Sequence, residues 1–153
     1  MNFTFDVTIK NRTIFKSFLE NLDLEQLNKV PEGYNNNIFW NIAHTVVTQQ
    51  ILVYKLSGLP MLLEEDFVDK YKKGTKTEHE ATQAEVDFVK GLLFSTIEKT
   101  KEDYTNRVFQ TFHEYTVTTK STLTTVEEAI AFNNFHEGIH LGYILAQKRA
   151  LKI

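Results

Sequence analysis

Two of the five histidines in the sequence, His136 and His140, stand four residues apart near its C-terminal end. In a helix this spacing places two side chains about 40° apart around the axis and about 6 Å apart along it. Two imidazoles at that separation can bind one metal ion. The pair is the only tight grouping among the five histidines, and the elements that position it decide whether a third ligand joins it.

Both histidines fall in a narrow polar band of the predicted last helix, together with Asn133 and Gln147, and apolar residues flank the band on both sides. The predicted second long helix repeats the pattern, with a polar band made of Asn37, Asn41, His44, Thr48 and Lys55. Such a band is more typical of a cleft between helices than of a solvated face. If the two bands face each other, His44 joins His136 and His140 around one point.

Three neutral imidazoles from rigid helices suit a divalent ion such as zinc or nickel. A site with three protein ligands keeps one coordination position open, which is typical of catalytic rather than structural sites. Water bound there has its pKa lowered to about 7, and a bound thiol is deprotonated.

Two other metalloenzyme templates fit this segment less well. Residues 136–140 match the zinc-protease pattern H-E-x-x-H, with Glu137 as the general base. However, residues 141–153 contain no Asp, Glu or His that could act as a further ligand. The di-iron carboxylate bundle needs Glu-x-x-His on two helices, and only Glu137 and His140 have this spacing.

Helical periodicity and few breakers, 2 prolines and 6 glycines, predict an all-α fold. Long helices are expected over residues 6–21, 37–57, 83–104 and 125–150, with short helices after Asp23 and over 64–73. Capping boxes are predicted at Asp23/Gln26, Thr82/Glu85 and Thr124/Glu127. Residues 107–122 are rich in Thr, Phe, Tyr and Val, which favours an extended connection or a small hairpin. Together these elements predict an antiparallel four-helix bundle with a long, partly extended crossover before the last helix.

Composition limits the other possibilities. A chain of 153 residues is expected to form a single domain, residues 1–153. It has no cysteine, which excludes disulfides, cysteine-ligated zinc, iron–sulfur clusters and a cysteine nucleophile. The net charge of -3 offers no basic field for nucleic acid. We expect no membrane span and, without a secretory signal at the start, a cytoplasmic protein.

Residues 40–44, Trp-Asn-Ile-Ala-His, and 135–144, Phe-His-Glu-Gly-Ile-His-Leu-Gly-Tyr-Ile, resemble the DinB-like (DinB/YfiT) superfamily of metal-binding four-helix-bundle proteins. The resemblance covers essentially the whole chain. It implies an up-down-down-up bundle with a divalent metal site at His44, His136 and His140, and homodimers are common among its members. Characterised relatives include enzymes that use low-molecular-weight thiols.

Our leading hypothesis is therefore a metal-dependent enzyme of the thiol-transferase kind, which holds a small thiol against an electrophilic small molecule. Side chains that could orient the ligands or shape the pocket are Asn41, Thr48, Asn133, Glu137, Tyr143 and Trp40. Two alternatives stay open: a non-catalytic metal-binding stress or scaffold protein, and a metallohydrolase that uses metal-bound hydroxide. The aromatic residues Phe3, Phe5, Phe109, Phe112 and Tyr115 are candidates either for a dimer surface or for a cover over the end of the bundle.

Overall fold

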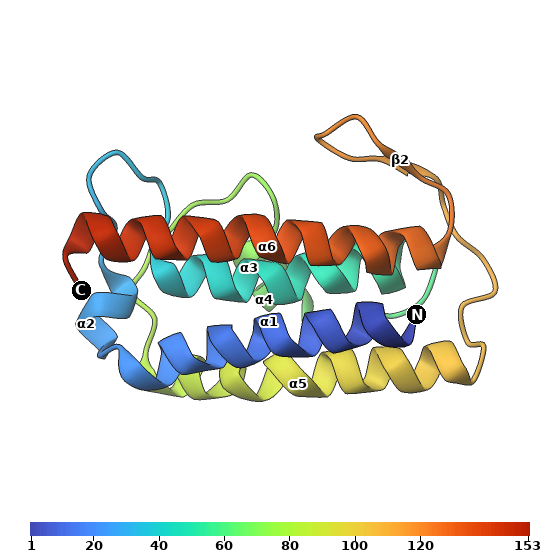
Figure 1. The fold of residues 1–153 in the computed structure, drawn as a ribbon, viewed down its shortest axis with the longest axis horizontal. Coiled ribbons are helices and arrows are strands. Elements are labelled where there is room, and N and C mark those ends of the chain that lie inside the picture. The colour runs from blue at the N-terminus through green and yellow to red at the C-terminus, as the bar shows by residue number, and fades with distance from the viewer.

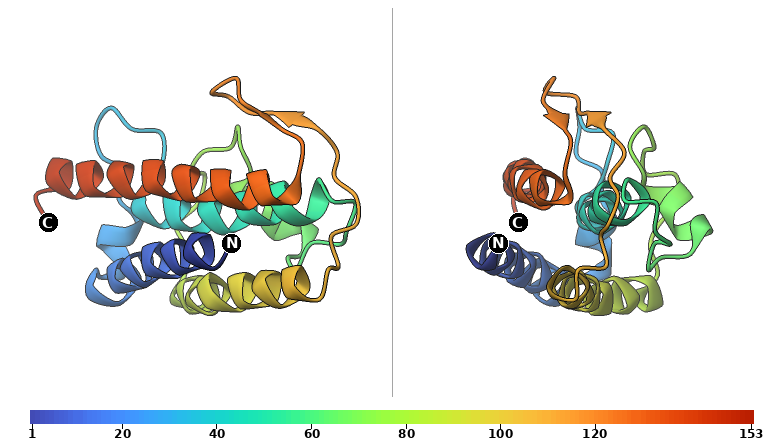
Figure 2. Two further views of the ribbon diagram at one scale, coloured as in Figure 1. Left: turned by 45° about the vertical axis from the view of Figure 1, so that its right-hand side comes forward. Right: turned by 90° about the vertical axis from the view of Figure 1, so that its right-hand side faces the viewer.

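A computed structural model describes residues 1–153 and is mostly helical, which confirms the predicted all-α class. Four long helices lie side by side in Figure 1: α1 (Asn2–Asn21), α3 (Ile38–Gln50), α5 (Gln83–Thr105) and α6 (Val126–Leu151). α6 contacts both α1 and α3, and α5 contacts the same two helices from the other side. Seen end-on in Figure 2, these helices surround a common interior.

The interior is filled by apolar side chains from all four long helices, including Phe15, Val46, Leu93 and Ile144, each fully buried. α3 is buried on almost every side, because it packs against α5, α6 and the short helices α2 (Leu24–Asn28) and α4 (Glu65–Tyr71). Its continuous apolar sequence therefore reflects a central position in the bundle. None of the helices combines the length and the apolarity needed to cross a bilayer.

The ends of the helices follow local sequence signals with two exceptions. The boxes Asp23/Gln26 and Thr82/Glu85 form as predicted. The third is displaced by one residue: Thr125 caps α6 by accepting from the backbone N–H of Glu128, whose carboxylate accepts from the N–H of Thr124. The predicted Thr124/Glu127 box is therefore wrong, because Glu128 reaches back to Thr124 from four residues away.

The second exception is α1, which begins at Asn2, four residues before the predicted start. Phe5 explains the longer helix, because its side chain is only 2% exposed. It packs in a cluster with Val126 and Ile130 of α6 and with the partly buried Tyr104 of α5. Of the two roles considered for Phe5, the exposed dimer surface is wrong for the same reason, and the buried ring fits the packing role instead.

Two irregular segments complete the chain. α3 continues as a π-helical turn, η1 (Ile51–Lys55), and the chain then turns at Gly58, which has a φ of +71°. Residues 106–125 connect α5 to α6 and contain an antiparallel hairpin of β1 (Tyr115–Thr116) and β2 (Thr122–Leu123). The hairpin projects beyond α6 in Figures 1 and 2, and the predicted extended connection is thus present.

Candidate metal centre

Three of the five histidines come together where α3 packs against α6. His44 lies on α3, and His136 and His140 lie one turn apart on α6. One nitrogen from each ring lies within 4.8 Å of the other two. Nε2 of His136 and Nε2 of His140 are 3.2 Å apart. The parts of the two predicted polar bands that hold Asn41, His44, His136, His140 and Gln147 therefore face each other, and the three histidines could hold a metal ion.

The ring of His44 is oriented by groups on the side away from the other histidines. Its Nδ1 lies 2.6 Å from the backbone carbonyl of Tyr71, the last residue of α4. A carbonyl only accepts, so Nδ1 carries the proton and Nε2 keeps a free lone pair. Trp40, one turn earlier on α3, stacks on the imidazole with ring centroids 4.6 Å apart and planes within 11°.

The ring of His140 is held in the same way by an amide. Its Nδ1 lies 2.8 Å from Oδ1 of Asn41. The amide nitrogen of Asn41 donates to the carbonyl of Asn37 at 2.8 Å and to Oε1 of Gln147 at 3.2 Å, which directs the amide oxygen towards His140. Nδ1 of His140 is therefore the donor, and Nε2 presents its lone pair to the other two rings.

The surroundings of the remaining nitrogens suit a cation. The hydroxyl of Thr48 lies 3.2 Å from Nε2 of His44, at the edge of the point where the rings converge. Nδ1 of His136 is buried and has no hydrogen-bond partner in the protein. The Nε2 lone pairs of His44 and His140 converge on Nε2 of His136, which lies 3.2 Å from Nε2 of His140 and either donates a proton to it or presents a third lone pair. In the second tautomer, a positively charged ion bound by the three rings would compensate the lone pairs.

Burial makes these histidines poor bases. It lowers the pKa of His136 to about 2 and that of His140 to about 3, and repulsion between the rings adds to both shifts. The pKa of His44 is also lowered by burial, against the opposing effect of the Tyr71 carbonyl. All three imidazoles are consequently neutral at neutral pH, the form that binds metal.

Glu137 and Asn133 lie elsewhere, in the interior between α6, α1 and α5. The Glu137 carboxylate is fully buried and pairs with the guanidinium of Arg12 of α1 at 3.0 Å. Asn133 donates to the same carboxylate oxygen at 2.9 Å. Arg12 also donates to the hydroxyl of Thr96 on α5 at 2.7 Å. The structure therefore does not bring Glu137 or Asn133 to the histidines, although the sequence had suggested both as neighbours of the ligands.

Sequence reasoning missed the partner of Glu137. Arg12 follows Thr8 and precedes Phe15 and Leu19 on one buried stripe of α1. A charged residue at a core position of an amphipathic helix indicates a buried partner. That signal was present in the sequence, but the identity of the partner depended on how α1 packs against α6.

A pocket of about 880 Å³ opens beside the histidines, between the loop that precedes α3 and the C-terminal half of α6. His140 and Asn41 form part of its wall, and the predicted pocket residue Tyr143 lines it with 54% of its surface exposed. The lining residues are Gly33, Tyr34, Asn35, Asn36, Trp40, Asn41, Ile139, His140, Gly142, Tyr143, Ala146 and Gln147. The loop residues 33–36 were not predicted to take part.

Comparison with protein-family models assigns the chain to a superfamily. The family model of the DinB superfamily matches residues 8–144, a range that includes all three clustered histidines. The chain therefore belongs to the DinB superfamily. A comparison with curated proteins gives no match.

Proposed function

We propose that this protein is a metal-dependent enzyme of the thiol-transferase kind, with a divalent ion, zinc or nickel, bound by His44, His136 and His140. The observation that carries the proposal is the convergence of three neutral imidazoles, two of which are oriented by a hydrogen bond to Nδ1. Two of them donate their Nδ1–H groups to fixed oxygens, those of Tyr71 and Asn41. Such partners hold the tautomer and the ring direction of metal-binding histidines.

The pocket beside His140 supports an enzyme over a purely structural metal site. Three histidines leave a coordination position open, and a divalent ion held there would bind a small thiol as its thiolate. The walls formed by Tyr34, Trp40 and Tyr143 give the organic part of the thiol, or an electrophilic partner, a surface to pack against. In this proposal His140 and Asn41 form the end of the pocket nearest the metal, where the reacting sulfur lies.

The test is metal content followed by activity. Protein purified without a histidine tag should hold about one divalent ion per chain, and His44→Ala and His140→Ala should each lose it. His79→Ala is the matched control, because His79 is exposed and pairs with Glu85. The metal-loaded protein should then transfer a thiol to a generic electrophile.

The two alternatives give different results in the same assays. Ester hydrolysis that needs no thiol would identify a metallohydrolase instead. Stoichiometric metal binding with no turnover across thiols and esters would favour a non-catalytic metal-binding protein. Absence of metal from the wild-type protein, even after incubation with zinc or nickel, would contradict all three functions.

We further propose that residues 1–153 form one domain with up-down-down-up topology. The colour gradients in Figure 1 support this order, since α1 and α6 run one way and α3 and α5 the other. In this arrangement His44 and the His136–His140 pair belong to antiparallel neighbours, α3 and α6.

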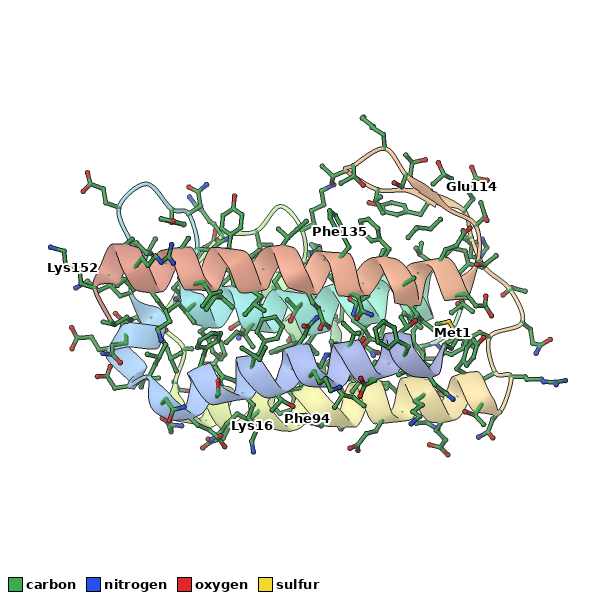
Figure 3. The ribbon with its side chains drawn as sticks, in the orientation of Figure 1. Met1, Lys16, Phe94, Glu114, Phe135 and Lys152 are labelled. Carbon is green, nitrogen blue, oxygen red and sulfur yellow. The ribbon has the colours of Figure 1, made fainter.

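We also propose that two copies of the chain associate through the outer face of α6. Between Ala129 and Gln147 the only charged residue of α6 is the buried Glu137, and Phe135 on the outer face is 53% exposed and points away from the bundle in Figure 3. Acidic residues lie at the start of this helix and basic residues at its end. Antiparallel pairing of two α6 helices would bring these opposite charges together.

A further inference from the structure

The pocket beside His140 has an unusual composition for a site that would receive a metabolite. Its volume of about 880 Å³ lies within the range of small-molecule sites. None of its twelve lining residues is Asp, Glu, Lys or Arg. A ligand with a carboxylate or phosphate group would find no opposite charge on these walls.

The apolar part of the wall is aromatic. The rings of Tyr34, from the loop before α3, and Tyr143, from α6, meet edge to face with centroids 6.3 Å apart. Trp40 also lines the pocket, and its indole N–H is already bonded to the hydroxyl of Thr75 at 3.2 Å. These residues present flat, uncharged surfaces that favour an apolar or aromatic group.

Part of the polar wall is hydrogen-bonded to other groups of the protein. The amide oxygen of Asn41 accepts from His140, and its amide nitrogen donates to Asn37 and Gln147. The amide nitrogen of Gln147 donates to the carbonyl of Asn36. All polar side chains of the wall are neutral, so none of them can balance the charge of a ligand anion, and burying an unpaired charge is costly.

We propose that this pocket selects an uncharged ligand with an aromatic or apolar group packed against Tyr34 and Tyr143, and that the thiol accepted by the enzyme carries no carboxylate or phosphate. The statement about the thiol rests on the proposed function, because it assumes that the sulfur of the ligand binds the metal. The preference of the pocket for a neutral aromatic group follows from its own walls and can be measured separately.

The first experiment uses the cobalt-loaded protein, in which bound thiolate gives a sulfur-to-cobalt absorption band. Benzyl mercaptan should produce the band at a concentration at least about tenfold lower than 4-(mercaptomethyl)benzoic acid, which differs by one carboxylate. Tyr143→Ala should weaken binding of benzyl mercaptan. Ala146→Arg, which adds a cation to the wall, should reverse the preference between the two thiols.

The matched control is Leu145→Arg, because Leu145 is the exposed neighbour of Ala146 on α6 and does not line the pocket. It should leave the preference unchanged. Equal or tighter binding of the carboxylated thiol to the wild-type protein would overturn the proposal, as would a reversal caused equally by both arginine variants.

A second experiment separates this proposal from the proposed function. In metal-free protein, benzyl alcohol should shift the indole N–H resonance of Trp40, whereas benzoate at the same concentration should not. If benzyl alcohol binds but no thiol gives the cobalt band, the pocket proposal stands and the thiol-transferase function fails. If neither compound binds, or benzoate binds as well as benzyl alcohol, the pocket proposal fails.

Discussion

At the scale of single residues, the direction of two of the three imidazoles depends on the acceptor that each Nδ1 contacts. His44 is fixed by the carbonyl of Tyr71 and by the indole of Trp40, and His140 by the amide of Asn41. His136 has no such partner for Nδ1. Its position therefore comes from the α6 backbone and from packing, so we expect the two oriented rings to contribute most to metal affinity.

Removing the amide behind His140 should weaken the site without removing a ligand. Asn41→Ala should lower metal affinity by about 10- to 100-fold, as loss of a hydrogen-bond partner to a ligating histidine generally does, measured by competition with a chromophoric chelator. Asn133→Ala is the control, because Asn133 bonds to Glu137 and to no histidine. An equal loss of affinity in both variants would contradict the role assigned to Asn41.

The lowered histidine pKa values predict acid sensitivity of the metal-free protein. The unfolded chain takes up protons on its histidines below pH 6.5, whereas folded His136, with a pKa of about 2, does not. The free energy of unfolding should therefore fall between pH 7 and pH 5, by up to about 2 kcal/mol from this residue. Urea unfolding of His136→Gln should show a smaller fall than wild type, and an identical fall would contradict the assignment.

At the scale of the elements, α6 presents different chemistry on different faces. His136 and His140 face α3, Glu137 faces Arg12 of α1, and Phe135 faces outward. Arg12 also donates to the Leu93 carbonyl of α5 at 2.9 Å. The buried pair thus connects α1, α5 and α6.

Breaking this pair should destabilise the bundle strongly. Arg12→Met should cost about 3–5 kcal/mol, since it leaves the Glu137 carboxylate buried without its partner. The double variant Arg12→Met/Glu137→Leu should recover much of the loss. The control Lys10→Met removes an exposed ion pair with Asp6 and should change stability by less than about 1 kcal/mol. Urea unfolding measures all three, and similar losses in Arg12→Met and Lys10→Met would contradict the account.

The ends of the helices could be predicted from the sequence where they are marked by local motifs. Capping boxes and the glycine turn at Gly58 marked helix ends because they depend on residues three or four apart. The start of α6 was misplaced by one residue because two adjacent threonines can both bond to Glu128. The early start of α1 depends on Phe5 packing against α6, a contact across the whole chain.

At the scale of the whole molecule, the site depends on which helices become neighbours. The spacing of His136 and His140 was visible within one helix, and the polar band around His44 within another. Their meeting requires α3 to pack against α6, which neither segment determines alone. The pocket wall at residues 33–36 and the Arg12–Glu137 pair were missed because both arise only from tertiary packing.

The proposed dimer gives a prediction at the same scale. Light scattering coupled to size-exclusion chromatography should show a dimer for the wild-type protein, and Phe135→Lys should shift it towards monomer by burying a charge in the contact. Phe88→Lys is the control, because Phe88 is equally exposed, at 52%, but lies on α5. A monomeric wild-type protein, or equal dissociation by both variants, would contradict an interface on α6.

The central claim is that imidazole nitrogens of His44, His136 and His140 bind one cation. X-ray diffraction data collected at the zinc and nickel absorption edges on crystals of the metal-loaded protein test it most directly. The account predicts a single anomalous peak about 2.0–2.1 Å from a nitrogen of each of the three rings. A peak at other residues, or fewer than three histidine ligands at this one, would contradict it.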